Sequence, residues 1–131
     1  MIVPGSASQS LSAALAAETG LPLAGTSYER FPDGEGLVAV EGASGLAGER
    51  VVVVAATPTD AAHVELLQLQ DAVAEAGASE VVTVLPYMGY ARQDASFEAG
   101  QPISARAVAR AISTAADRVL VVNPHKRWVC D

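Results

Sequence analysis

Three short runs of aliphatic, mostly β-branched residues recur along the chain and constrain its fold more than any other feature. They are RVVVVAA (residues 50–56), EVVTVL (residues 80–85) and RVLVVNP (residues 118–124). Runs of this kind are typical of strands that are buried on both faces of a sheet. The segments between them, residues 61–76 and 103–115, are rich in alanine and have helical spacing. Buried strands that alternate with helices predict an α/β domain with a mostly parallel sheet and flanking helices.

The first forty residues add further elements to this pattern. Residues 1–3 predict a short strand, and residues 8–19 predict a helix that Gly20 closes. Residues 23–41 predict two extended segments around a turn that contains proline, aspartate and glycine.

The two later helices carry their own start and stop signals. Ser104 is expected to cap the helix over residues 103–115, and Gly77 is expected to close the helix over residues 61–76. The apolar residues of the helix over 61–76 are expected to lie on its inner side. They are Val64, Leu66, Leu67, Leu69 and Val73.

Composition limits the class of protein. The 131 residues suffice for one domain with a single core. Fifteen acidic residues face eight basic ones, for a net charge of −7, so a basic stripe for a phosphate backbone is lacking and we expect no nucleic-acid partner. No apolar run approaches the ~18 residues of a membrane helix, and no signal peptide is recognisable, so we expect a cytoplasmic protein without membrane contact. Cys130 is the only cysteine, which excludes an intrachain disulfide and a cysteine-based zinc site.

Polar side chains gather where the predicted strands end. Residues 57–59 (Thr-Pro-Thr), 90–94 (Tyr-Ala-Arg-Gln-Asp) and 123–125 (Asn-Pro-His) follow the three apolar runs. Residues 31–35 (Phe-Pro-Asp-Gly-Glu) form the turn between the two extended segments. In open α/β sheets, ligands bind beyond the carboxyl ends of the strands. These four clusters are therefore the candidate binding residues.

The clusters after the strands each have a reading with a ligand and a reading without one. Arg92 offers a planar fork of donors that matches phosphate oxygens, with Gln93 beside it. A surface ion pair between Arg92 and Asp94 fits the same residues and would contribute little. His125 is able to bind a metal through a neutral imidazole, but a lone histidine is more often a surface or capping residue.

The turn residues are open in the same way. Asp33, Gly34 and Glu35 can contact a ligand or merely form a turn, because Asp-Gly is a common turn pair. Phe31 beside them can stack on a flat base or belong to the core. His63, inside a predicted helix, is expected to have no functional role.

Several standard motifs are absent from the sequence. It contains no G-x-x-x-x-G-K-[ST] loop, no G-x-G-x-x-G fingerprint and no G-x-S-x-G elbow. The residues therefore do not indicate a P-loop NTPase, a Rossmann dehydrogenase or an α/β-hydrolase.

Four segments, taken together and in this order, resemble a known family. They are RFPDGE (residues 30–35), LPYMGYARQD (residues 85–94), GQPISARAVARAI (residues 100–112) and ADRVLVVNPH (residues 116–125). They resemble the N-terminal domain of ribose-phosphate pyrophosphokinase, the synthetase of phosphoribosyl pyrophosphate. The Asn-Pro-His form is more similar to the archaeal branch. The resemblance implies the first domain of a type I phosphoribosyltransferase-like fold.

The resemblance also implies an activity and a set of site residues. The family transfers the β,γ-diphosphoryl group of MgATP to the 1-hydroxyl of ribose 5-phosphate, and its members assemble into oligomers. By resemblance, Asp33, Gly34 and Glu35 contact the adenosine end of ATP, usually from a neighbouring subunit, and Phe31 stacks there. Arg92 and Gln93 match the pair that binds ATP after the strand, where the tyrosines pack the loop. His125 matches a histidine associated with Mg²⁺.

The resemblance covers residues 1–131 but corresponds to only the first half of a family member. The sugar-phosphate-binding domain that follows in the family is absent from this sequence. We therefore expect the chain to be inactive alone and to need a second half from elsewhere. The alternative is a non-catalytic module that binds ATP, or pairs with subunits, and regulates a full-length synthetase.

Overall fold

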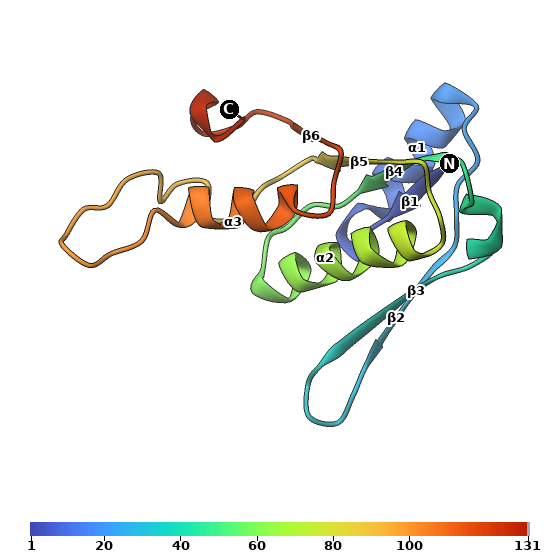
Figure 1. Ribbon diagram of the computed structural model, residues 1–131, viewed down its shortest axis with the longest axis horizontal. Helices are drawn as coiled ribbons and strands as arrows, with labels where there is room; N and C mark the ends of the chain where they lie inside the picture. Colours follow the sequence, from blue (N-terminus) through green and yellow to red (C-terminus); the bar gives the residue numbers. More distant parts are fainter. Residues whose placement is uncertain (131) are drawn as a thin grey trace.

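The computed structural model describes residues 1–130 and contains a four-stranded parallel sheet, flanking helices and a separate hairpin (Figure 1). In spatial order, the sheet strands are β1 (Ile2–Pro4), β4 (Arg50–Val54), β5 (Glu80–Leu85) and β6 (Arg118–Val121). The helices are α1 (Gln9–Thr19), α2 (Asp60–Glu75) and α3 (Ser104–Ser113), with 3₁₀ turns at η1 (Ser6–Ser8), η2 (Ala43–Leu46) and η3 (Arg127–Cys130). The antiparallel hairpin pairs β2 (Thr26–Arg30) with β3 (Gly36–Val40). The predicted α/β domain with a mostly parallel sheet is confirmed.

The core lies between the sheet and the helices α2 and α3. Alternate residues of β4 and β5 point toward these helices, and Val51, Val53 and Leu85 are buried there. From α2, Leu66 and Leu69 complete the same cluster. Small aliphatic side chains therefore build the core, as the low aromatic content indicates. No helix within residues 1–130 combines the length and the apolarity that a membrane crossing requires.

One predicted core position of α2 is wrong. Val64 is 52% exposed, whereas Leu66, Leu69 and Val73 are buried. The three buried residues recur at the spacing of a single helix face. Val64 lies two positions before this series and therefore points to the flank of the helix, where it lines a cavity beside the hairpin.

Most helix ends follow the expected signals, but one does not. Gly20 closes α1 in the left-handed region with a φ of 71°, as predicted. Thr59 caps α2 by accepting a hydrogen bond from the N–H of Ala62 at 3.2 Å. The expected cap by Ser104 is wrong, because Ile103 occupies the N-cap position. The hydroxyl of Ser104 instead donates to a side chain of the preceding loop, described below.

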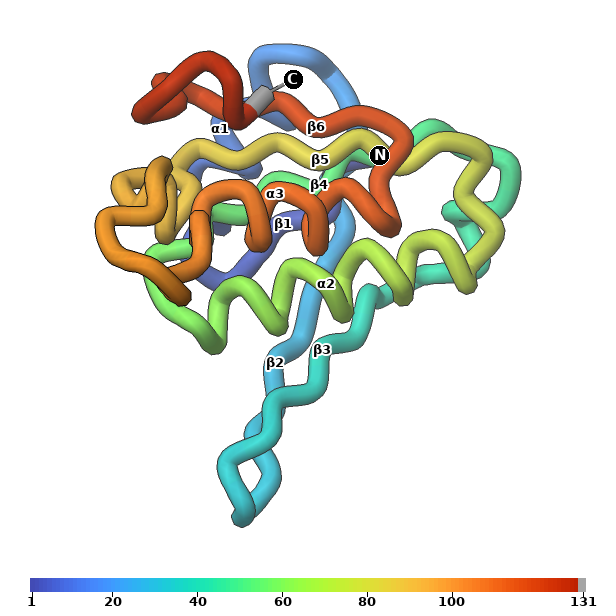
Figure 2. The backbone as a smooth tube through the Cα atoms, turned by 60° about the vertical axis from the view of Figure 1, so that its left-hand side comes forward, coloured from blue at the N-terminus to red at the C-terminus, as the bar shows by residue number. Residues whose placement is uncertain are grey.

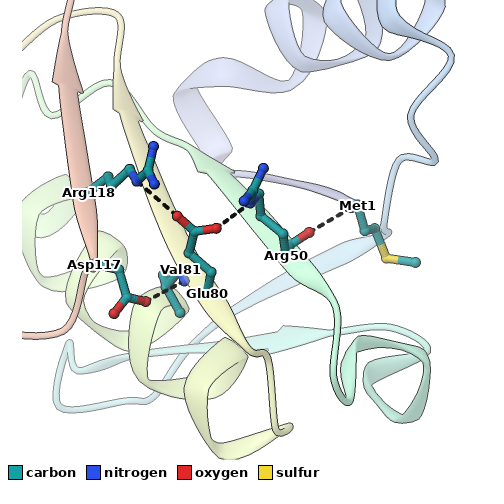
Figure 3. Close-up of polar contacts among 6 residues, drawn as sticks. All are labelled: Met1, Arg50, Glu80, Val81, Asp117 and Arg118. Atoms are coloured by element: carbon teal, nitrogen blue, oxygen red, sulfur yellow. Dashed lines mark hydrogen bonds and ion pairs between the residues drawn. The ribbon is translucent and has the colours of Figure 1, made fainter.

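Charged side chains tie the strands together at the amino edge of the sheet, where β4, β5 and β6 begin (Figure 3). Glu80 of β5 pairs with Arg50 of β4 and, at 2.9 Å, with Arg118 of β6. The carboxylate of Asp117 accepts a hydrogen bond from the N–H of Val81 at 2.7 Å. The two arginine side chains are 67% and 69% exposed. Each ion pair therefore contributes only about 0.2–1 kcal/mol.

The other face of the sheet is less covered. Val82, Val84 and Leu120 alternate with the core residues and so point away from α2 and α3. Leu120 is 51% exposed, and Val122 after β6 is 53% exposed. The helix that contacts β1, α1, lies at the opposite edge of the sheet. One face of β6 packs against α3 while its other face remains open to solvent. The expectation that this strand is buried on both faces is therefore wrong, because no helix within residues 1–130 covers its outer face.

The hairpin of β2 and β3 forms an arm that extends past α2 and away from the sheet (Figures 1 and 2). At its base, the N–H of Ala24 donates to the carbonyl of Ile2 at 2.8 Å. Farther out, the side-chain amide of Gln68 in α2 donates to the carbonyl of Gly36 at 2.9 Å. An isolated two-stranded hairpin is marginally stable in water, so these contacts hold the arm in place.

Candidate functional site

Two of the candidate clusters meet where β4 and β5 end, at the carboxyl edge of the sheet. Thr57 is buried and forms a parallel bridge with Met88. Its N–H donates to the carbonyl of Tyr87 at 2.9 Å, and the N–H of Gly89 donates to its carbonyl and to its hydroxyl, both at 3.1 Å. These bonds join Thr57 to residues 87–89, which lead into the second cluster, and form one layer at the edge where α/β sheets bind ligands.

Gly89 has no room for a side chain. A Cβ at this position would lie 2.3 Å from the carbonyl oxygen of Thr57 and 2.9 Å from Nε2 of His63. Only glycine allows the loop after β5 to pass this close to the start of α2. The close approach brings the next residue, Tyr90, over the helix.

The first turn of α2 holds the side chain of Tyr90 at two points. The Tyr90 hydroxyl donates to Oδ1 of Asp60, and its ring centroid lies 5.5 Å from that of His63, at an interplanar angle of 51°. The backbone of Tyr90 has a φ of 63°, in the left-handed region that few non-glycine residues adopt. Tyr90 thus packs the loop against α2 through one side of its ring, although 46% of the residue is exposed; Tyr87 is 53% exposed.

A carboxylate and burial change the acidity of these two rings. The hydrogen bond to Asp60 raises the pKa of Tyr90 above 10.0, because losing the phenolic proton would set two negative charges side by side. Burial lowers the pKa of His63 below 6.5, and the Asp60 carboxylate opposes this shift only in part. Both ring nitrogens of His63 are buried without a hydrogen-bond partner in the described part of the chain.

Arg92 and Gln93 lie side by side in the loop between β5 and α3 but have different surroundings. Arg92 is exposed, and within residues 1–130 it forms no ion pair, so the alternative of a pair with Asp94 is wrong. Gln93 is half-buried, and its Oε1 accepts a hydrogen bond from the hydroxyl of Ser104 at 2.6 Å. Its Nε2 donates to the carbonyl of Pro102 at 3.5 Å. Gln93 therefore ties the loop to α3, and Arg92 presents its guanidinium to solvent.

His125 follows β6 at the same edge of the sheet and is exposed. Asn123 before it has a φ of 48°, a left-handed conformation that asparagine tolerates. Among the described residues, no three side chains of the His, Cys, Asp and Glu types are grouped so that they could hold a metal ion. The assignment of His125 to a metal ion therefore stays a prediction.

The fourth cluster forms the tip of the hairpin arm. The N–H of Gly34 donates to the carbonyl of Phe31, and the N–H of Phe31 donates to the carbonyl of Glu35, both at 2.8 Å. Oδ1 of Asp33 accepts from the N–H of Glu35 at 3.1 Å, and Gly34 has a φ of 94°. Asp33 and Gly34 therefore build the turn. The ring of Phe31 is 45% exposed, which excludes a place in the core.

A cavity of about 810 Å³ lies between the hairpin arm and the start of α2. Gly34 and Glu35 line it from the arm, and Asp60 lines it from the helix. Along its wall, the carboxylate of Glu65 accepts hydrogen bonds from the N–H and from the hydroxyl of Ser6, both at 2.7 Å. The cavity thus extends from the arm to the residues that begin α2, and neither Thr57 nor Tyr90 lines it.

The predicted site residues occupy two places in the structure. The residues at the carboxyl edge of the sheet are Arg92, Gln93 and His125. The residues at the tip of the arm are Phe31, Asp33, Gly34 and Glu35. Of these seven, Gly34 and Glu35 line the cavity beside the arm, so that cavity does not bring the two groups together.

Two residues of the layer were missed from the sequence. His63 was expected to have no role, and Asp60 was not singled out, yet both contact Tyr90. They lie three residues apart in the first turn of α2, a spacing that places both side chains on one helix face. That spacing was visible in the sequence, but the loop that would cover it was not.

Comparison with known proteins relates the whole chain to one family. Residues 1–116 match the family described as the N-terminal domain of ribose phosphate pyrophosphokinase. The chain is 64% identical over 131 residues to a ribose-phosphate pyrophosphokinase of Halobacterium salinarum, covering 100% of this chain and 46% of that protein. It is 45% identical over 130 residues to one of Methanosarcina mazei, covering 99% of this chain and 42% of that protein. The chain thus spans about half the length of these relatives.

A solved structure shares the fold. The crystal structure of phosphoribosylpyrophosphate synthetase from Mycobacterium smegmatis matches with a TM-score of 0.85 at 30% sequence identity. The match covers 98% of this chain and 44% of the other. The match therefore includes the hairpin arm as well as the sheet and its helices.

Proposed function

Since the chain belongs, as an N-terminal domain, to the family of ribose-phosphate pyrophosphokinases, we propose that it supplies the ATP-binding side of an enzyme that makes phosphoribosyl pyrophosphate. In this reaction the 1-hydroxyl oxygen of ribose 5-phosphate attacks the β-phosphorus of ATP. The bond from that phosphorus to the α,β-bridging oxygen breaks, AMP leaves, the proton of the attacking hydroxyl is released, and the diphosphoryl group ends on the sugar.

The observation that carries the proposal is the placement of Arg92. Its guanidinium is exposed in a loop at the carboxyl edge of a parallel sheet, where ligands bind in such folds. The planar fork of donors matches phosphate oxygens. Phosphoryl transfer depends on positioning and on charge neutralisation more than on covalent chemistry by the protein. A cation on a loop that Gln93 ties to α3 suits this task.

We assign the adenosine end of ATP to the tip of the hairpin arm. Phe31 offers an exposed ring for stacking on the base, and the carboxylates of Asp33 and Glu35 are acceptors for ribose hydroxyls. Gly34 lets the backbone of the tip come close to the nucleotide. Because the arm leads away from the sheet that carries Arg92 (Figure 2), we propose that the tip serves the nucleotide of a neighbouring subunit.

We propose that magnesium arrives with the nucleotide. Mg²⁺ usually keeps several waters and is held by substrate phosphates plus one or two protein groups. Residues 1–130 offer no cluster of three ligand side chains, which fits an ion carried by ATP and not one held by the domain alone. In this chain, His125 is the residue we assign to the ion, which would neutralise charge on the phosphates.

The sugar-phosphate site is assigned to the part of the relatives that this chain does not match. The chain spans 46% of the Halobacterium salinarum protein. We propose that the unmatched part binds ribose 5-phosphate and completes the active site beside Arg92. Turnover of both substrates then depends on that part.

Replacing Arg92 by alanine is expected to weaken MgATP binding by about tenfold or more, because a charge-assisted hydrogen bond contributes about 1.5–3 kcal/mol. Calorimetric titration of the chain with MgATP, without sugar phosphate, measures this effect. Arg106→Ala is the matched control, since Arg106 is an exposed arginine on α3 and its loss changes the net charge equally. An equal loss of MgATP affinity in both variants would mean that the change in net charge, and not the position of Arg92, causes the effect. Absence of MgATP binding by the unaltered chain would contradict the proposed function itself.

We also propose that the chain associates with further copies of itself. The exposed side chains of Leu120 and Val122 extend an apolar face of the sheet, and such faces mark interaction surfaces. In sedimentation velocity, we expect the sedimentation coefficient to rise with protein concentration. The double substitution Leu120→Ser and Val122→Ser should abolish this rise. The control substitution Leu11→Ser, at an exposed position of α1, should not. A single monomeric boundary at all concentrations would contradict the association.

A further inference from the structure

The side chain of His63 points from α2 toward the loop after β5. The proposed function gives this residue no role. It occupies the first turn of α2, three residues after Asp60. Both ring nitrogens are buried, and neither has a hydrogen-bond partner within residues 1–130. Buried ring nitrogens without partners are far better tolerated in a neutral imidazole than in a cation.

The loop after β5 closes on this ring from two sides. The backbone of Gly89 passes so near that a Cβ would lie 2.9 Å from Nε2 of His63. The ring of Tyr90 lies 5.5 Å from the imidazole, centroid to centroid. Gly89 is itself fixed by its hydrogen bonds to Thr57. Residues 89 and 90 therefore rest directly against the imidazole.

Tyr90 in turn sets the course of the loop toward Arg92. Its φ of 63° reverses the chain, and its carbonyl accepts the N–H of Gln93 at 3.2 Å, which closes a turn that contains Arg92. A left-handed conformation at a bulky residue persists only where the surroundings hold it. Here the ring contact with His63 and the hydrogen bond to Asp60 are those surroundings.

We propose that neutral His63 is a positioning residue for nucleotide binding, because it seats the ring of Tyr90 and so holds the turn that presents Arg92. This inference rests on the proposed function, which assigns the nucleotide to Arg92. Protonation of His63 would place a charge and an unpaired donor between Gly89 and Tyr90. Tyr90 would then lose its packing against His63. The turn would no longer be held in place, and Arg92 would no longer be held in one direction.

The groups around His63 set the direction of the pH dependence. They are the Asp60 carboxylate on α2, the Tyr90 phenol on the loop, and the uncharged Gly89 and Thr57. Burial lowers the pKa of His63 below 6.5 in the folded chain, so the unfolded chain takes up the proton first as the pH falls. The packing of Tyr90 against His63 is therefore fully stable above about pH 6.5. It is lost as the pH falls from there through the pKa of His63 in the folded chain.

An NMR titration of the unaltered chain from about pH 8 to about pH 5 tests, without any nucleotide, whether the loop depends on the protonation of His63. The chain has two histidines, and a His125→Gln variant assigns their ring signals. We expect the backbone amide signals of residues 89–93 to shift with the same midpoint as the His63 ring. Amides that do not shift, or that follow another midpoint, overturn the proposal.

His63→Leu is the matched variant, because leucine fills a similar volume with an apolar group that takes no proton. We expect the pH-dependent shifts of the amides of residues 89–93 to disappear in it. Glu18→Gln removes a titratable group from an exposed position of α1 and should leave those shifts in place. Shifts that persist in His63→Leu overturn the proposal.

Calorimetric titration with MgATP then measures the link to the nucleotide. Phosphate groups also titrate near pH 6, so the relevant quantity is the Kd of the unaltered chain divided by that of His63→Leu. We expect this ratio to rise at least about threefold between about pH 7.5 and about pH 5.5. A constant ratio overturns the positioning role. If neither chain binds MgATP at any pH, the proposed function fails, while the NMR titration still decides whether His63 seats the loop.

Discussion

Gly89→Ala is expected to lower the free energy of unfolding by about 3 kcal/mol, because overpacking of a closed contact costs about 1–3 kcal/mol and this contact is with backbone. The added Cβ would lie 2.3 Å from the carbonyl oxygen of Thr57, and that atom has little freedom to move. Thr57 is fully buried and is bound on both sides by the loop after β5. Relief requires the loop to move away from α2, which separates Tyr90 from His63. MgATP binding should therefore weaken along with stability.

Gly45→Ala is the matched control for this substitution. No atom lies within 4 Å of a Cβ built at Gly45, and its φ is outside the left-handed region. Its free energy of unfolding should remain within about 0.5 kcal/mol of that of the unaltered chain. Urea denaturation followed by circular dichroism compares the two variants. Equal stability of both would show that the loop is not closely packed against Thr57.

Gln70→Ala is expected to lower the free energy of unfolding by about 3–4 kcal/mol, since it combines a cavity with the loss of buried hydrogen bonds. Gln70 is fully buried in α2. Its Nε2 donates to the hydroxyl of Thr83 in β5 at 2.8 Å and to the carbonyl of Ile112 in α3 at 3.1 Å. One side chain thus connects three elements across the core, and removing it leaves both partners buried without a donor.

Gln68→Ala provides the comparison for Gln70→Ala on the same helix. Gln68 is half-buried, and its amide donates one hydrogen bond, to Gly36 of the arm. Its loss should lower the free energy of unfolding by only about 1 kcal/mol. Urea denaturation again measures both. A loss of less than about 1 kcal/mol for Gln70→Ala would mean that the core closes around the missing side chain.

The sheet and its helices were predictable because local patterns determine them. Runs of β-branched residues predicted the strands β4, β5 and β6, and the position of Gly20 predicted the end of α1, but the runs did not show that β6 is open on one face. The errors arise where another part of the chain decides the environment. Val64 has the hydrophobicity of a core residue but faces the hollow beside the arm. Ser104 has the chemistry of a cap, yet its hydroxyl is taken by Gln93 from the loop.

The candidate site was predictable only in its residue types and in its edge of the sheet. The carboxyl ends of parallel strands meet at one edge, so the placement of Arg92 and His125 follows from the strand pattern. That the turn at residues 31–35 lies apart from that edge could not be predicted, because the direction of the arm depends on its contacts with α2. The packing of Tyr90 against the first turn of α2 could not be predicted for a similar reason. It needs the close approach of Gly89, which no local pattern encodes.

The ionic cluster at the amino edge of the sheet and the ligand loops at its carboxyl edge are two separate regions, so each can evolve without the other. Glu80 and the loop that carries Tyr90 stand at opposite ends of β5, whose six residues span roughly 17 Å. Substitutions this far apart, without shared partners, usually add in free energy. A lineage under new ionic conditions could rewrite Arg50, Glu80 and Arg118 and leave the ligand loops intact. A lineage under selection for another nucleotide could rewrite the loops on the same strands.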